Sequence, residues 1–93
     1  MPFMLTLENG ASSGPNHMTH SGHEFVFCIR GQLEYQVENK FYLLEMGDSL
    51  LFEARLNHRW RNSGGTVTNA LIIISDDTEG DHSASIHAEE KEA

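Results

Sequence analysis

From Gln32 to Glu38 the sequence reads QLEYQVE, in which polar and apolar residues alternate without a break. Successive side chains of a β-strand project to opposite faces, so this period of two predicts a half-buried strand with Leu33, Tyr35 and Val37 directed inward. No stretch of the first 75 residues shows the sustained apolar period of about 3.6 that marks an amphipathic helix. The segment therefore predicts an all-β protein.

Further strands are expected on both sides of this segment, at intervals of about 8–12 residues. Turn-forming residues separate them, among them Gly31 and the pair Gly47-Asp48, and Asn39-Lys40 fits the tight turn of a hairpin. Short strands at this spacing are typical of a β-sandwich or barrel. The expected strands cover residues 3–7, 24–30, 41–44, 49–52, 58–61 and 67–75.

The 93-residue chain divides into one folded domain, residues 1–75, and an acidic tail, residues 76–93. The tail carries seven acidic residues and one lysine, a net charge of −6, and Ile86 is its one large apolar side chain. Such a segment buries too little apolar surface to offset the entropy of ordering its backbone, so a loosely attached tail is expected. An edge strand over residues 85–88 is the alternative.

Composition excludes several classes of protein. Residues 1–75 carry a net charge of only −2 and no basic stripe, so direct contact with nucleic acid is not expected. No apolar run approaches the ~20 residues of a membrane span. Cys28 is the only cysteine, which fits a structural thiol in a reducing cytoplasm. A small core and the apolar run from Leu71 to Ile74 predict a homodimer.

Two short segments hold the candidate site. His20 and Glu24 are separated by an even number of residues, as are His58, Trp60 and Asn62, so each set would project from one face of an extended chain. Two imidazoles and one carboxylate suit Zn, Fe, Mn, Ni or Cu and leave coordination positions open. The alternative is a set of hydrogen-bonded buried residues that binds an organic ligand or nothing.

The neighbouring charged residues are assigned to the surface. His17 and His23 lie at odd spacing from His20 and are expected to be solvated. Arg59 and Arg61 flank Trp60 and would face away from His58, as surface charges or at a subunit contact.

The spacing of these residues resembles the cupin superfamily, whose first motif is written G-x5-H-x-H-x(3,4)-E-x6-G. Glu24, six residues and Gly31 fit the end of this motif, with His20 at its second histidine. Met18 stands at the first histidine. The resemblance therefore implies a metal set of His20, Glu24 and His58, in which the methionine thioether would favour copper.

The second cupin motif, G-x5-P-x-G-x2-H-x3-N, is matched in spacing by Gly47, His58 and Asn62. Glu53 and Arg55 replace its proline and second glycine. The resemblance covers residues 3–75 and implies a small cupin-type β-barrel, the double-stranded β-helix or jelly roll.

Within the superfamily, the chain looks most like the C-terminal sensor domain of bacterial helix-turn-helix transcriptional regulators. That resemblance implies a receptor for a small molecule that also dimerises. The helix-turn-helix itself is absent from these 93 residues, which would make the chain a detached domain or a stand-alone relative.

The sequence thus predicts a ligand-sensing domain with one divalent transition metal as its possible cofactor. The rival is a metal-dependent enzyme of the dioxygenase, isomerase or decarboxylase type, against which stands the lack of a second general acid or base at inward positions. An inert interaction domain is the third alternative. The predicted metal ligands are His20, Glu24 and His58, and the predicted ligand-binding residues are Tyr35, Trp60 and Asn62.

Overall fold

The computed structural model describes residues 1–75, which form seven β-strands. Within this range there is no helix that could cross a membrane. Every expected strand is present to within two residues at each end, while the predictions for the tail lie outside the described residues. The strands are β1 (Pro2–Leu7), β2 (His23–Arg30), β3 (Gln32–Val37), β4 (Lys40–Glu45), β5 (Ser49–Glu53), β6 (His58–Arg61) and β7 (Thr68–Ser75).

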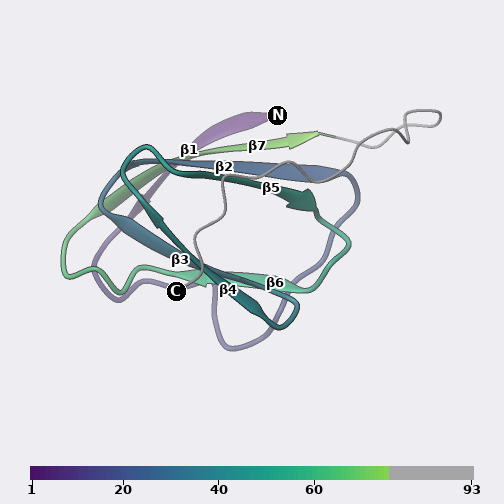
Figure 1. The fold of residues 1–93 in the computed structure, drawn as a ribbon, viewed down its shortest axis with the longest axis horizontal. Coiled ribbons are helices and arrows are strands. Elements are labelled where there is room, and N and C mark those ends of the chain that lie inside the picture. Colours follow the sequence, from purple (N-terminus) through teal and green to yellow (C-terminus); the bar gives the residue numbers. More distant parts are fainter. Residues whose placement is uncertain (76–93) are drawn as a thin grey trace.

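The strands form two antiparallel sheets that face each other (Figure 1). One sheet has the order β1-β7-β2-β5 and the other the order β4-β3-β6. The chain passes repeatedly between them, so that β7 returns to pair with both β1 and β2. The all-β prediction is therefore confirmed, and the inner faces of the two sheets enclose the core.

The hairpin between β3 and β4 differs by one residue from the expected turn. The turn residues are Glu38 and Asn39, and Lys40 already belongs to β4. Glu38 adopts a positive φ of 55°, a conformation that two-residue hairpin turns favour. Its backbone amide donates to the Asn57 carbonyl and its carboxylate accepts from the Asn57 amide, both at 2.8 Å. These contacts tie the turn to a loop that is distant in sequence, so they could not be predicted from the residues of the turn alone.

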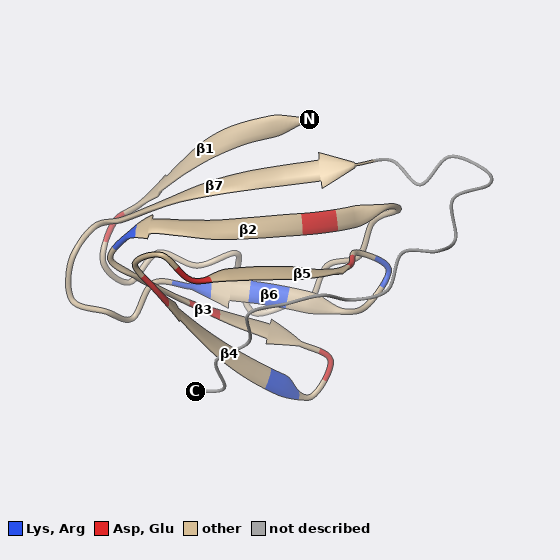
Figure 2. Cartoon of the chain, turned by 45° about the horizontal axis from the view of Figure 1, so that its top comes forward, with Lys and Arg blue, Asp and Glu red and all other residues tan. Residues whose placement is uncertain are grey.

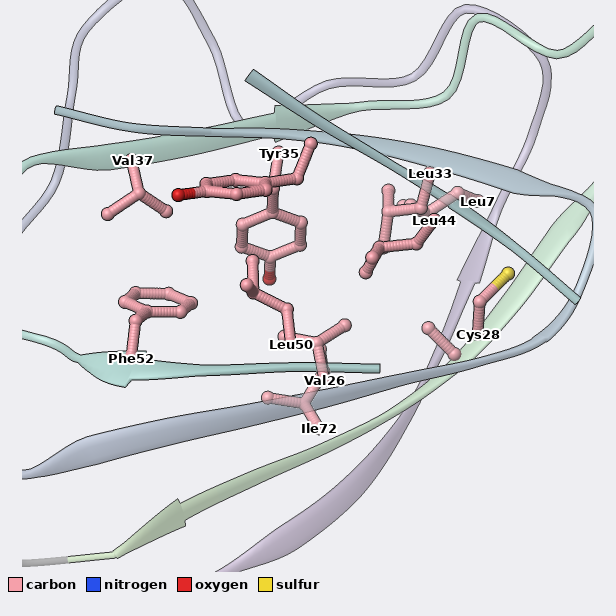
Figure 3. Packing of buried hydrophobic residues seen from close by; sticks show 12 residues of the cluster. Leu7, Val26, Cys28, Leu33, Tyr35, Val37, Leu44, Leu50, Phe52 and Ile72 are labelled. Carbon is pink, nitrogen blue, oxygen red and sulfur yellow. The ribbon is translucent and has the colours of Figure 1, made fainter. Parts of the chain in front are cut away.

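The core consists of side chains from both sheets (Figure 3). In β3 every second residue is buried, which confirms the inward direction of Leu33, Tyr35 and Val37. Because the pleat sends alternate residues to opposite faces, the same strand presents polar residues on its outer side. The buried cluster comprises Leu7, Val26, Cys28, Leu33, Tyr35, Val37, Tyr42, Leu44, Leu50, Phe52, Ala70 and Ile72.

Candidate metal centre

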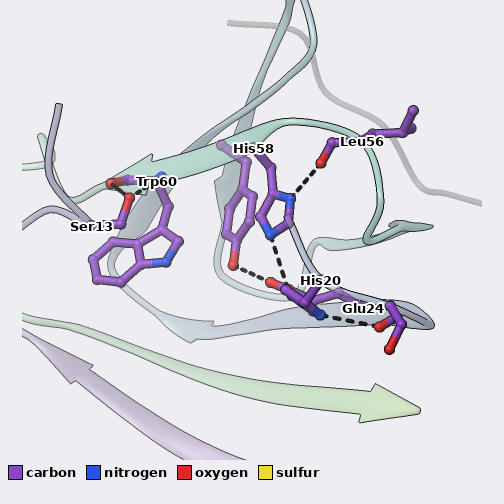
Figure 4. Close-up of polar contacts among 8 residues, drawn as sticks. Ser13, His20, Glu24, Leu56, His58 and Trp60 are labelled. Carbon is purple, nitrogen blue, oxygen red and sulfur yellow. Dashed lines mark hydrogen bonds and ion pairs between the residues drawn. The ribbon is translucent and has the colours of Figure 1, made fainter. Parts of the chain in front are cut away.

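Three predicted ligands meet between the sheets near the start of β2 and β6 (Figure 4). One ligand atom from each of His20, Glu24 and His58 lies within 4.8 Å of the other two. Glu24 and His58 are buried, and the His20 side chain is 32% exposed. The cluster is therefore enclosed on the protein side, with His20 at its solvent side.

Glu24 and His58 reach the cluster from strands, as their parity predicted. Glu24 is on β2 and pairs with Phe52 of β5, while His58 is the first residue of β6. His20 does not lie on a strand, because β2 begins only at His23. The parity argument, which placed His20 and Glu24 on one extended segment, therefore does not explain the position of His20.

Main-chain contacts hold the loop that carries His20. Met18 and His58 exchange two backbone hydrogen bonds of 2.8 and 3.0 Å, and the His20 amide donates to the Ala54 carbonyl at 3.0 Å. The loop is thus anchored to β6 and to the chain that follows β5. His20 occupies its position through these anchors rather than through the alternation of a strand.

Both oxygens of the Glu24 carboxylate are engaged. Oε1 lies 3.0 Å from His20 Nε2, and Oε2 accepts a hydrogen bond of 2.7 Å from the Tyr35 hydroxyl. Burial alone would raise the pKa of Glu24, but the contacts with His58, Tyr35 and His20 outweigh it and lower the pKa below the ordinary 4.5. Glu24 is therefore a carboxylate at neutral pH. Burial and the nearby Glu24 charge raise the pKa of Tyr35, which stays a neutral donor.

The backbone fixes the orientation of His58. Its Nδ1 lies 2.7 Å from the Leu56 carbonyl, which can only accept, so Nδ1 carries a proton. In the neutral ring Nε2 then presents its lone pair to the cluster. Burial would lower the pKa of His58, but Glu24 and the Leu56 carbonyl raise it above the ordinary 6.5. Phe52 packs against the ring edge-on, with centroids 4.9 Å apart.

The donor set fits a divalent transition metal. His58 Nε2 is fully enclosed, and among the described residues it has a 3.4 Å ion-pair contact with Glu24 Oε1 but no well-formed hydrogen bond. Buried polar atoms are rarely left in this state, and a ligand atom awaiting a metal is one explanation. Leu56 and Tyr35 orient His58 and Glu24 in the way that outer-shell partners orient metal ligands.

The other predicted site residues have different surroundings. Tyr35 belongs to the cluster through Glu24. Trp60 is partly buried against the core, and its backbone bonds to Ser13. The Asn62 side-chain amide donates to the carbonyls of residues 7, 8 and 66, and its Oδ1 accepts from the amide of residue 64. Asn62 thus ties together the loops beside β6.

Several nearby residues lie outside the cluster. His17 is exposed, as expected, whereas His23 is half-buried rather than solvated. Cys28 is fully buried, and burial together with the charges of Asp48 and Glu45 raises the pKa of its thiol, which confirms a structural cysteine. The roles of the Leu56 and Ala54 carbonyls were not predicted, because every residue has a backbone carbonyl and the sequence does not show which of them meets a distant residue. The inward parity of Phe52 could have placed it beside the site.

Comparison with known proteins gives the family. The cupin domain model matches residues 3–74. The Cupin_2 domain of an XRE family transcriptional regulator from Enterobacter cloacae is 26% identical, with a TM-score of 0.68 over 76% of this chain and 75% of that one. No curated protein matches the chain.

Two other solved structures share the fold at lower identity. A predicted oxalate decarboxylase from Thermotoga maritima is 23% identical, with a TM-score of 0.67 over 81% of this chain and 66% of that one. Iron(II) HppE in complex with substrate is 20% identical, with a TM-score of 0.66 over 80% and 44%. The chain thus spans less than two thirds of both proteins. Because the cupin model covers almost all of the described residues, the chain belongs to the cupin family.

Proposed function

We propose that this domain binds one divalent transition metal through His20, Glu24 and His58, and that the metal holds a small polar or anionic molecule in a sensory role. The proposal depends on the enclosed His58 Nε2, which lies within 4.8 Å of a ligand atom from each of the other two residues and has only the 3.4 Å contact with Glu24 instead of a well-formed hydrogen bond. When bound, the metal would supply a Lewis acid with open coordination positions. Similarity to the cupin domain of a transcriptional regulator supports the sensory role.

The chain's own residues prepare the site for this ligand. Tyr35 holds Glu24 Oε2, which leaves Oε1 directed at the two imidazoles. The Leu56 carbonyl keeps the proton of His58 on Nδ1, away from the cluster. A small molecule would enter from the side of His20, because the other two ligands are almost fully enclosed.

The outer face of the four-stranded sheet supports a homodimer. Register places Met4, Leu71, Ile73, Phe25, Phe27 and Leu51 together on this face. Polar residues border it, with Asn69 and Thr6 at one end and His23 and Glu53 at the other. Figure 2 shows β1 and β7 without a charged residue. An apolar centre with a polar rim is typical of an interface, and one such face can pair with its own copy about a twofold axis.

The test is thermal melting of the metal-free chain with each candidate ion, followed by a panel of small polar and anionic compounds added to the loaded chain. A ligand that binds only the folded state raises the melting temperature. We expect one ion to raise the melting temperature and at least one compound to raise it further in the presence of that ion.

A cytoplasmic location stays a prediction.

The same melting experiment is repeated with the variant His20→Ala and with the control His17→Ala. His20 belongs to the cluster, whereas His17 is an exposed histidine three residues earlier. Loss of the metal response in His20→Ala alone supports the proposal. An equal response in all three proteins, or none in any, contradicts metal binding at the cluster. Conversion of an added compound to product would instead favour the enzymatic alternative.

A further inference from the structure

A cavity of about 430 Å³ lies on the outer side of the three-stranded sheet, away from the metal centre. The side chains of Tyr35 and His58 are buried in the domain, whereas Glu34, Gln36 and Arg59, which have the opposite parity, line this cavity. Trp60, which shares the parity of His58, also contributes to the lining. Ser12, Gly14 and Pro15, from the loop before β2, form its rim. The volume is within the range of small-molecule sites.

The three strands contribute three kinds of side chain to this surface. Gln36 of β3 is paired with Phe41 of β4 on one side and with Arg59 of β6 on the other. In the next row Glu34 pairs with Arg61. The surface therefore changes from apolar at β4, through polar at β3, to cationic at β6, and Figure 2 shows the arginines in blue on β6.

The two arginines differ in their partners. Arg61 is 63% exposed along its side chain and forms an ion pair of 2.7 Å with Glu34. Arg59 is half-buried, and its Nε and Nη1 donate at 2.9 and 2.7 Å to the Gln36 side chain and the Pro15 carbonyl, which are both neutral. The Arg59 guanidinium is thus held in place without a carboxylate partner among the described residues. Its remaining N–H groups can donate to a ligand.

We propose that this cavity is a second binding site, which takes an organic monocarboxylate with an apolar body. The carboxylate would bind Arg59, and the apolar body would cover Phe41, a residue that is 43% exposed. Arg59, Arg61 and Glu34 together carry a charge of +1, which one carboxylate neutralises. A dianion such as a phosphate monoester would exceed this charge and be repelled by Glu34. Arginine pairs with carboxylates through two parallel hydrogen bonds.

The test is a titration of ¹⁵N-labelled, metal-free chain with three probes, followed by NMR. The probes are 3-phenylpropionate, its neutral amide 3-phenylpropionamide, and propionate, which lacks the ring. We expect 3-phenylpropionate to give saturable shifts at the amides of β3, β4 and β6, and the other two probes to bind at least about tenfold more weakly, because each lacks one of the two contacts. The protein is kept free of metal so that the carboxylate of the probe cannot bind to a metal ion at the other site.

Matched variants connect these shifts to the cavity. Arg59→Met should weaken 3-phenylpropionate binding at least about tenfold, through loss of a charge-assisted hydrogen bond. Arg55→Met is the control, because Arg55 pairs with Glu53 outside the cavity. If Arg59→Met has a lowered melting temperature, Phe41→Ser, at an exposed position, is the second test of binding in the cavity. Three results overturn the proposal: no saturable shifts, shifts centred on His20 and Glu24, or unchanged affinity in both Arg59→Met and Phe41→Ser.

Discussion

At the scale of single residues, the site depends on a short chain of buried contacts. Tyr35 donates to one oxygen of Glu24, and the other oxygen faces His20 and His58. Parity along the sequence was enough to find Glu24, His58 and Tyr35, because all three lie on regular strands. His20 matched the same arithmetic although it lies in a loop. Even spacing from Glu24 and the resemblance to the cupin motif both pointed to His20, and the structure places it in the cluster through loop contacts rather than through a strand.

The hydrogen bond between Tyr35 and Glu24 should stabilise the fold measurably. Tyr35→Phe leaves a buried carboxylate oxygen without its donor, so we expect the free energy of unfolding to fall by about 1–3 kcal/mol at neutral pH. Urea denaturation measures the change. A double-mutant cycle with Glu24→Gln isolates the pair, and strictly additive effects would contradict the coupling.

The metal-free chain should be most stable between about pH 4.5 and 6.5. The lowered pKa of Glu24 gives stability that is present above its ordinary value of 4.5 and is lost as pH falls through the folded value. The raised pKa of His58 gives stability that is present below its ordinary value of 6.5 and is lost as pH rises through the folded value. Urea denaturation across this range, with Glu24→Gln as control, should show a maximum that the variant lacks. A steady rise in stability up to pH 8 would be inconsistent with these shifts.

At the scale of strands, alternation and turn residues predicted the elements well, while contacts between distant segments set the details. The turn at Glu38 and the loop that carries His20 depend on bonds to Asn57, Ala54 and His58. Such bonds join residues far apart in sequence and give no local signal. The cavity beside Arg59 was missed for a related reason. Its arginines were predicted to be surface charges, and only the register of three strands together with a loop shows that these residues line a cavity.

Two glycines with the same backbone conformation should respond differently to alanine. Gly31 and Gly47 have φ angles of +86° and +90°. A Cβ at Gly31 would lie 2.4 Å from Thr68 Oγ1 and 2.7 Å from the Val67 carbonyl oxygen, whereas nothing lies within 4 Å at Gly47. Gly47→Ala should therefore lose about 1–2 kcal/mol from backbone strain alone, and Gly31→Ala about 1–3 kcal/mol more from the steric clash. Equal losses in urea denaturation would refute the close approach of β7 to Gly31.

At the scale of the whole molecule, a domain of 75 described residues has a small core and an apolar outer face. From the sequence, the apolar run in β7 indicated that part of this outer face is apolar. It could not show that Phe25 and Phe27 of β2 share the face with Ile73 and Leu71, because strand order decides which residues become neighbours.

This face should hold two copies of the chain together. Phe25→Asp places a charge at its centre, opposite Ile73 and Leu51, so we expect the variant to be a folded monomer. Met46→Asp is the control, since Met46 is 72% exposed in the turn between β4 and β5 and lies off the face. Light scattering during size-exclusion chromatography gives the mass of each. A monomeric parent chain, or a dimeric Phe25→Asp variant, contradicts the proposed interface.

Isothermal titration of the metal-free chain with Zn²⁺ shows whether the buried cluster binds a metal. We expect one ion per chain, a strong loss of affinity in His20→Ala, and no change in His17→Ala. Binding should weaken at lower pH, because a protonated His58 must release its proton to bind. If neither Zn²⁺ nor any other candidate ion binds saturably, or if His20→Ala binds the metal as tightly as the parent chain, the cluster is not a metal site.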